Sequence, residues 1–120
     1  MKRHLATIGA AAALAGCAVS PHDLPTGDRT KRQFAAPPET VAHCIARNAE
    51  RIHAPYRGTA RPTGKGAWEV VVRIAGADDT SVLVAQLAPQ ASGTAASIWT
   101  TPHEFRLVRK DLASAVSEGC

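Results

Sequence analysis

The chain has 120 residues, of which 45% are hydrophobic and 20% charged, a balance typical of a small globular domain rather than a disordered chain. Its formal net charge of +4 falls to +2 when the N-terminal Lys2 and Arg3 are set aside, since 12 basic residues then stand against 10 acidic ones. Binding to nucleic acid rests on clustered positive charge, so this weak imbalance argues against a nucleic-acid partner. Only 4% of the residues are aromatic. The core must therefore be built from small aliphatic side chains, and a domain of this size is marginally stable without further support.

Residues 1–16 have the layout of a bacterial export signal. Lys2 and Arg3 give a positive start, and a 12-residue apolar run from Leu5 to Gly16 follows. A run of this length suits a signal peptide, because a helix that spans a membrane needs about 20 apolar residues.

The end of this leader, Leu14-Ala15-Gly16-Cys17, resembles the lipobox of bacterial lipoproteins, which a dedicated signal peptidase reads. The resemblance implies a diacylglyceryl group on the Cys17 sulfur, cleavage before Cys17, and acylation of the new amine, with palmitate among the expected chains. Two or three acyl chains hold a protein stably on a bilayer, whereas one does not. The alternative is a plain signal peptide in which the cysteine occurs by chance.

The same resemblance implies a location in the cell envelope, and Ala18, which stands where an aspartate would favour the inner membrane, favours the outer membrane and its periplasmic side. Residues 17–37 are predicted to be the lipidated cysteine and a flexible tether. The stretch 18–38 contains four prolines and little hydrophobic periodicity. A small basic cluster in it is expected to be solvated, and it consists of Arg29, Lys31 and Arg32.

A small domain is predicted over residues 38–120, and it begins with a helix over 38–52. Apolar residues recur there at helical spacing, which places them on one face. They are Val41, Cys44, Ile45, Asn48 or Ala49, and Ile52. Glu39 suits the positive end of the helix dipole, and Pro55 closes the segment.

The middle of the chain changes to a period of two, which predicts four strands over 56–61, 67–76, 81–88 and 94–100. In the second of these strands, one face carries Trp68, Val70, Val72 and Ile74, and the other carries Glu69, Val71 and Arg73. Turn-rich segments separate these strands, so an antiparallel meander is expected. A second helix is predicted from the capping box Thr101 and Glu104, with Phe105, Val108, Leu112, Ala115 and Val116 on one stripe. The fold class is α+β: helix, four-stranded antiparallel meander, helix, with both helices packed on one sheet face.

Cys44 and Cys120 remain as a pair once Cys17 carries lipid. Export places them where disulfides form and persist. Both lie on the apolar stripes of their predicted helices, so an intramolecular bridge is expected. The alternatives are an intermolecular bridge through Cys120 and a reactive thiol.

No motif in the chain carries recognisable chemistry. Gly58 to Gly66 faintly resembles a phosphate-binding loop, but the glycine spacing is wrong and Gly66 replaces the required hydroxyl, so a turn is predicted. Asp78 and Asp79 suit a hairpin loop. The histidines of the exported chain have no metal-ligand spacing and are expected to be solvated; they are His22, His43, His53 and His103. We therefore expect no metal, no cofactor and no enzymatic activity.

One surface feature points to binding. If Ile98 faces the core, Trp99 projects from the opposite sheet face, where Val71 and Arg73 should also lie. Leu83 or Leu87 is a further candidate for that face. An exposed tryptophan beside arginine is typical of a partner-binding surface. The alternative is that Trp99 packs under a loop.

These features favour a non-enzymatic, membrane-anchored lipoprotein that acts as an adaptor or accessory binding module. Its partner would be an envelope protein or a peptidoglycan-associated assembly. The alternative is an inhibitor or small-ligand binder that protects the envelope, for which a pocket between the sheet and the helices is expected. A small hydrolase is disfavoured because no nucleophile and base stand together.

Overall fold

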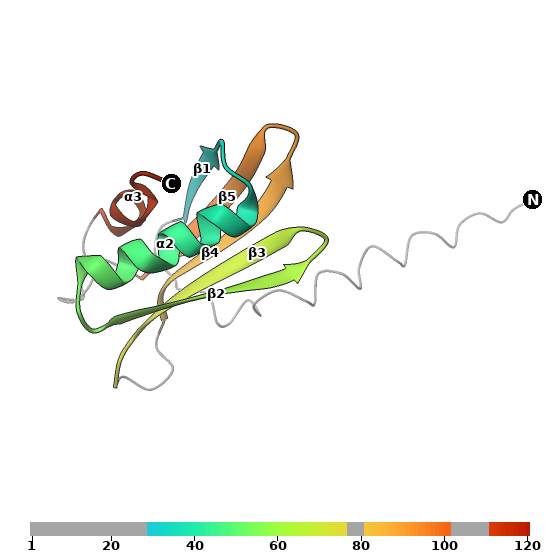
Figure 1. Ribbon diagram of the computed structural model, residues 1–120. Coiled ribbons are helices and arrows are strands. Elements are labelled where there is room, and N and C mark those ends of the chain that lie inside the picture. Colours follow the sequence, from blue (N-terminus) through green and yellow to red (C-terminus); the bar gives the residue numbers. More distant parts are fainter. Residues whose placement is uncertain (1–28, 77–80, 102–110) are drawn as a thin grey trace, which may run out of the picture.

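The computed structural model describes residues 29–76, 81–101 and 111–120. Within them it shows a five-stranded antiparallel sheet with two helices on one face (Figure 1). The strands are β1 (Arg29–Phe34), β2 (Tyr56–Gly64), β3 (Ala67–Ile74), β4 (Ser81–Gln90) and β5 (Gly93–Thr100); the helices are α2 (Pro38–Ile52) and α3 (Leu112–Ser117). The order across the sheet is β1-β5-β4-β3-β2. The α+β class and the meander from β2 to β5 are confirmed.

The fifth strand, β1, corrects the prediction of four strands and of a tether that continues to residue 37. Residues 29–34 pair antiparallel with β5, from Arg29 opposite Trp99 to Phe34 opposite Thr94. None of the six side chains of β1 is buried, and inward and outward positions alternate. Three basic residues among six led to the prediction of a solvated linker. Charged side chains are also typical of an edge strand, because they prevent it from pairing with another chain. The basic cluster of Arg29, Lys31 and Arg32 therefore belongs to the sheet.

Helix α2 has the predicted bounds and the predicted apolar stripe. Pro38 occupies an early helical position, where its missing N–H costs nothing, and Glu39 lies in the first turn. Val41, Ile45 and Ala49 are fully buried against the sheet. The helix contacts β2 and β3 most extensively and also touches α3, so one apolar stripe serves both the sheet and the second helix.

Helix α3 confirms only the end of the second predicted helix. Leu112 and Val116 are buried in the shared core, as the predicted stripe requires. Glu104, Phe105 and Val108 lie outside the described residues. Thr101 is described, and its backbone N–H donates to the carbonyl of Val82 at 3.0 Å, which extends the pairing of β4 and β5 by one residue. Its hydroxyl donates to the carbonyl of Ser81, also at 3.0 Å.

The β2–β3 hairpin explains the glycine-rich stretch that resembles a phosphate loop. Gly64 pairs with Ala67, so the loop is the two residues Lys65 and Gly66. Both have positive φ, 55° and 82°. Two consecutive positive φ angles define the hairpin turn whose twist matches that of the flanking strands. The prediction of a turn is confirmed.

The Cys44–Cys120 disulfide joins α2 to the C-terminus, with Cα atoms 5.7 Å apart and a sequence separation of 76 between the two cysteines. Asn48, one turn after Cys44, supports the same junction. Its side-chain amide donates to the carbonyl oxygens of Val116 at 2.8 Å and Glu118 at 2.9 Å. These two carbonyls belong to the last turn of α3 and the residue after it, where a helix has no internal donors left. Asn48 thus caps α3 from a neighbouring helix.

Replacing Asn48 with alanine is expected to lower the free energy of unfolding by about 1–2 kcal/mol, because the part-buried carbonyl of Val116 loses its donor. Asn48→Asp is a matched control, since it keeps the size of the side chain and removes the donors. Both variants should lose stability to chemical denaturant, the aspartate at least as much as the alanine. A destabilisation confined to the alanine variant would assign the effect to side-chain size and contradict the capping role.

Candidate binding face

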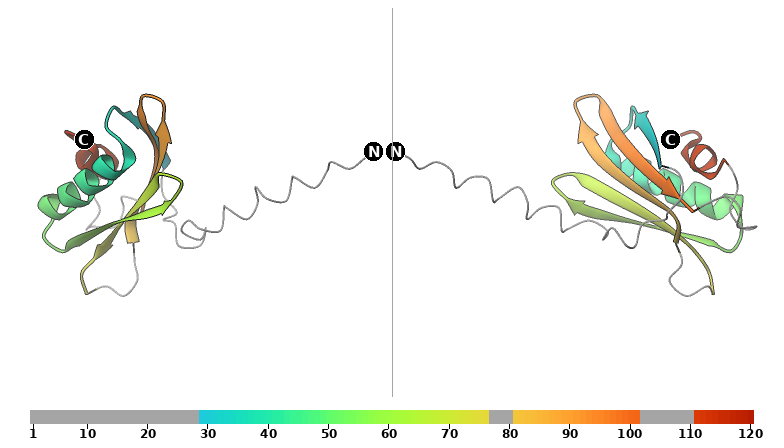
Figure 2. Two further views of the ribbon diagram at one scale, coloured as in Figure 1. Left: turned by 45° about the vertical axis from the view of Figure 1, so that its right-hand side comes forward. Right: turned by 180° about the vertical axis from the view of Figure 1, so that it is seen from behind.

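The face of the sheet opposite the helices, called the outer face below, is the surface that neither α2 nor α3 covers. Figure 2 shows it in its right-hand view, with the strands in front of α2. Antiparallel pairing aligns its side chains in rows that cross the strands. Two such rows, one largely apolar and one polar, make up the candidate site.

The apolar row contains the predicted binding residues Val71 and Trp99. Val84 of β4 pairs with Val71 on one side and Trp99 on the other, so the three side chains are neighbours on the outer face. Trp99 is half-buried, and the guanidinium of Arg29 lies 5.7 Å from the centre of its ring. This distance allows a cation–π contact. The strand pairing thus places Val71 and Trp99 on the same face of the sheet, as predicted.

Arg73 lies at the end of β3, on the same face as Val71, and is exposed. Leu83 and Leu87 do not belong to this face. They pair with Val72 and Trp68, face α2, and are 0% and 1% exposed. Both alternating sets of β4 side chains are apolar, so its periodicity could not distinguish the faces, and the larger leucines fill the core.

The polar row crosses the whole sheet with one residue from each strand. In spatial order it runs Lys31, Ser97, Gln86, Glu69, Arg61, and each is the direct cross-strand partner of the next. The carboxylate of Glu69 is buried and accepts a hydrogen bond from Nε of Arg61 at 2.8 Å. Their side chains are 1% and 58% exposed, so an exposed cation neutralises a buried anion.

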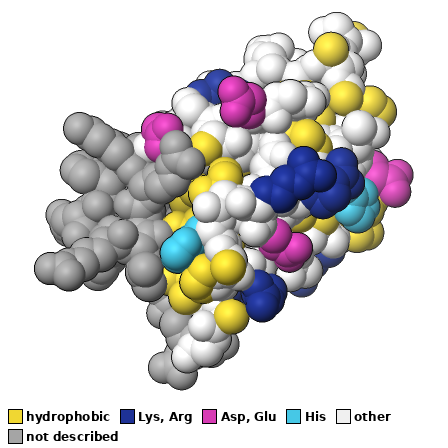
Figure 3. All heavy atoms as spheres, turned by 60° about the vertical axis from the view of Figure 1, so that its left-hand side comes forward, with side chains coloured by type: hydrophobic (Ala, Val, Ile, Leu, Met, Phe, Trp, Pro, Cys, Tyr) yellow, Lys and Arg dark blue, Asp and Glu magenta, His cyan; other side chains and the backbone are white. Residues whose placement is uncertain are grey.

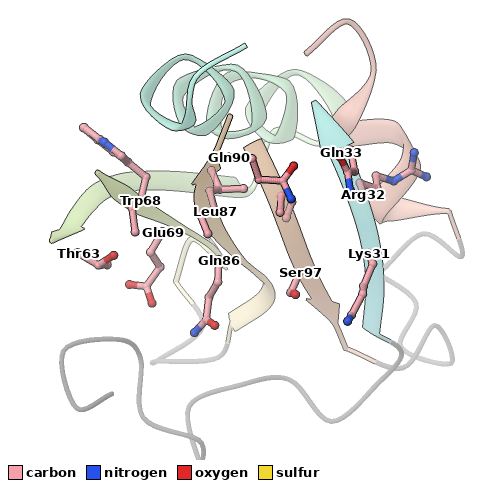
Figure 4. A pocket seen from close by; sticks show the side chains of 14 residues that line it. Lys31, Arg32, Gln33, Thr63, Trp68, Glu69, Gln86, Leu87, Gln90 and Ser97 are labelled. Atoms are coloured by element: carbon pink, nitrogen blue, oxygen red, sulfur yellow. The ribbon is translucent and has the colours of Figure 1, made fainter. Parts of the chain in front are cut away.

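A concavity of about 660 Å³ lies along this polar row. Figure 4 shows the side chains of Glu69, Gln86, Ser97 and Lys31 pointing to the same side of the sheet, away from α2. Small residues of the next row form part of its lining, namely Ala67, Ala88 and Ala95. A volume of this size falls within the range of sites that bind small molecules and short chains.

The charges of the described residues are distributed unevenly. Of residues 29–76, 81–101 and 111–120, the outer face carries one carboxylate, that of Glu69, and five cations: Arg29, Lys31, Arg57, Arg61 and Arg73. Figure 3 views the side of the molecule where α2 ends, and there basic and acidic side chains are interspersed. Among the described residues, the outer face is thus the cationic one.

The described histidines belong to aromatic contacts. His43 is exposed, as predicted, and packs edge-on against Trp68 at 5.3 Å. His53 is half-buried against Tyr56 at 4.9 Å, so the prediction of a solvated side chain is wrong there. His22, His103, Asp78 and Asp79 lie outside the described residues. Within residues 29–76, 81–101 and 111–120, no three His, Cys, Asp or Glu side chains come together as a metal site.

The model of one protein family matches the N-terminus: the prokaryotic membrane lipoprotein lipid attachment site, over residues 1–18. The chain is therefore a bacterial lipoprotein. It is anchored to a membrane of the cell envelope through lipid on Cys17, which lies outside the described residues. No match was found for this chain among curated proteins or among solved structures. In the described part of the chain, no helix is long and apolar enough to cross a membrane.

Proposed function

We propose that this lipoprotein is a non-enzymatic adaptor of the cell envelope, which holds a partner on the outer face of its sheet while Cys17 anchors it to the outer membrane on the periplasmic side. The observation that carries the proposal is the pair of half-buried apolar side chains Val71 and Trp99, which flank the buried Val84 beside Arg29 on the sheet face that both helices leave uncovered. Tryptophan and arginine are the side chains most enriched where binding energy concentrates in protein interfaces.

Replacing Trp99 with alanine tests the proposal. We expect crosslinking of the lipoprotein in intact cells of its source to capture an envelope partner, identified by mass spectrometry, and Trp99→Ala to reduce the yield at least about tenfold. Because Trp99 faces away from the core, the melting temperature should change little.

Arg47→Ala is the matched control, since Arg47 is an exposed residue of α2 on the opposite side of the sheet. This variant should crosslink like the wild type. A large fall in the melting temperature of Trp99→Ala would show that the side chain is structural. Equal crosslinking by all three proteins would exclude the outer face as the adaptor surface.

A second function, binding of a small ligand, is favoured by the 660 Å³ concavity. The sequence-based expectation for a ligand binder is a pocket between sheet and helices, whereas this concavity lies on the outer face. A ligand-dependent rise in melting temperature that survives Trp99→Ala would support this second function over the adaptor.

A further inference from the structure

We propose that the concavity on the outer face binds a short amide-linked chain that ends in a free carboxylate, and that this chain is a stem peptide of the cell wall. The inference rests on the proposed function, because it assigns a partner to the same face. It is carried by different residues, however: the polar row rather than the row of Trp99.

The centre of the concavity has two hydrogen-bonding side chains that no other described side chain or backbone group engages. Gln86 and Ser97 are both half-buried, and neither side chain has a hydrogen bond to another residue that the structure describes. A carboxamide provides two donors and one acceptor, and a hydroxyl provides one donor with acceptor capacity. Gln86 can therefore pair with both the N–H and the C=O of a peptide group. Partly buried polar groups without partners are what an amide-bearing ligand would satisfy.

The two ends of the row differ in charge. Lys31 is exposed, and within the part of the chain that the structure describes no carboxylate competes for its ammonium group, which can pair with a ligand carboxylate. At the other end, Glu69 is already held by Arg61. The row therefore favours a ligand whose carboxylate lies at Lys31 and whose uncharged amides extend over Ser97 toward Gln86.

The spacing sets the length of this ligand. Lys31, Ser97 and Gln86 come from three adjacent strands, so the distance from first to last is about 10 Å at the usual strand separation. An extended peptide rises about 3.3 Å per residue, and about three residues cover that distance. The alanine side chains beside the row leave room for such a chain to lie close to the sheet.

The position of the site favours the cell wall as the source. Lys31 belongs to β1, which directly follows the segment that leads from Cys17. Twelve residue steps separate Cys17 from Arg29, so the start of the sheet stands at most about 40 Å from the anchored cysteine. The polymer close to a bacterial envelope membrane is the cell wall, and its stem peptides are short, amide-linked and end in carboxylates.

Titration calorimetry of the purified lipoprotein in detergent micelles with soluble muropeptides tests the inference. We expect the wild type to bind, and Gln86→Ala and Lys31→Ala each to bind at least about tenfold more weakly. Lys31→Arg should retain binding within a few-fold. Arg57→Ala is the control on the same face outside the concavity, and it should bind like the wild type. Circular dichroism should show that all variants are folded.

Three results would overturn the inference: no binding of muropeptides, equal binding of glycan strands stripped of their peptides, and equal binding of muropeptides whose terminal carboxyl groups are amidated. Equal affinity for a carboxyl-terminal peptide of an unrelated protein would overturn the cell-wall source. Trp99→Ala separates this inference from the adaptor proposal. If muropeptides bind but crosslinking does not depend on Trp99, only the proposed adaptor surface is contradicted. If crosslinking depends on Trp99 but muropeptides do not bind, only the present inference is contradicted.

Discussion

Replacing both Cys44 and Cys120 with serine is expected to lower the free energy of unfolding by about 4.5 kcal/mol, the chain-entropy value for a closed loop of this length. The bridge restricts the unfolded chain, since it links α2 near the start of the domain to its last residue. A domain this small has a total stability of roughly 5 kcal/mol. The serine variant should therefore be close to unfolded at 37 °C.

The measurement is urea unfolding of the purified protein, followed by tryptophan fluorescence, with and without reductant. The wild type should lose most of its stability when reduced, and the double serine variant should be insensitive to reductant. Replacing both cysteines avoids a single free thiol, which could form bridges between molecules. A loss below about 1 kcal/mol on reduction would contradict this role of the disulfide.

Gly58→Ala should lower the free energy of unfolding by about 3 kcal/mol, at the upper end of what overpacking a core costs. A Cβ at this position of β2 would lie 2.7 Å from the carbonyl oxygen of Ala46 and 2.8 Å from its Cα. Both atoms belong to the backbone of α2, so no side-chain rotation can relieve the clash. The helix would have to move away from the sheet that buries its apolar stripe.

Gly76→Ala is the matched control for Gly58→Ala. Gly76 has φ +82°, but a Cβ there would meet nothing within 4 Å. This control should cost about 1 kcal/mol from its backbone conformation alone. Thermal or urea unfolding of both variants measures the difference. An equal or smaller loss for Gly58→Ala would show that α2 and β2 separate easily, and that their close approach is not required.

The elements that the sequence predicted well are those whose side chains are buried on one side only. The period-two alternation of residues 67–74 correctly placed Val70 and Val72 in the core and Val71 on the outer face. Strand β1 was missed because it is an edge strand with no buried side chain, and Phe34 is its only large apolar residue. Local periodicity cannot separate such a strand from a linker.

The polar row was missed for a different reason. Its residues come from five strands, and their alignment depends on cross-strand register, which no local pattern encodes. One signal was present: Glu69 is a carboxylate within the otherwise largely apolar strand 67–74, and the alternation already placed it opposite the core. Asn48 was recognised only as a position on the helix stripe, because its partners in α3 are far away in the sequence.

Site-specific photocrosslinking in intact cells tests most directly whether the outer face is the working surface of this lipoprotein. A photoreactive amino acid would replace Ala88, an exposed residue at the concavity, or Arg47, an exposed residue of α2 on the opposite side. An adaptor that uses the outer face should give a specific adduct, protein or cell wall, from position 88 and none from position 47. Adducts from position 47 alone, or identical adducts from both positions, would contradict a binding role for the outer face.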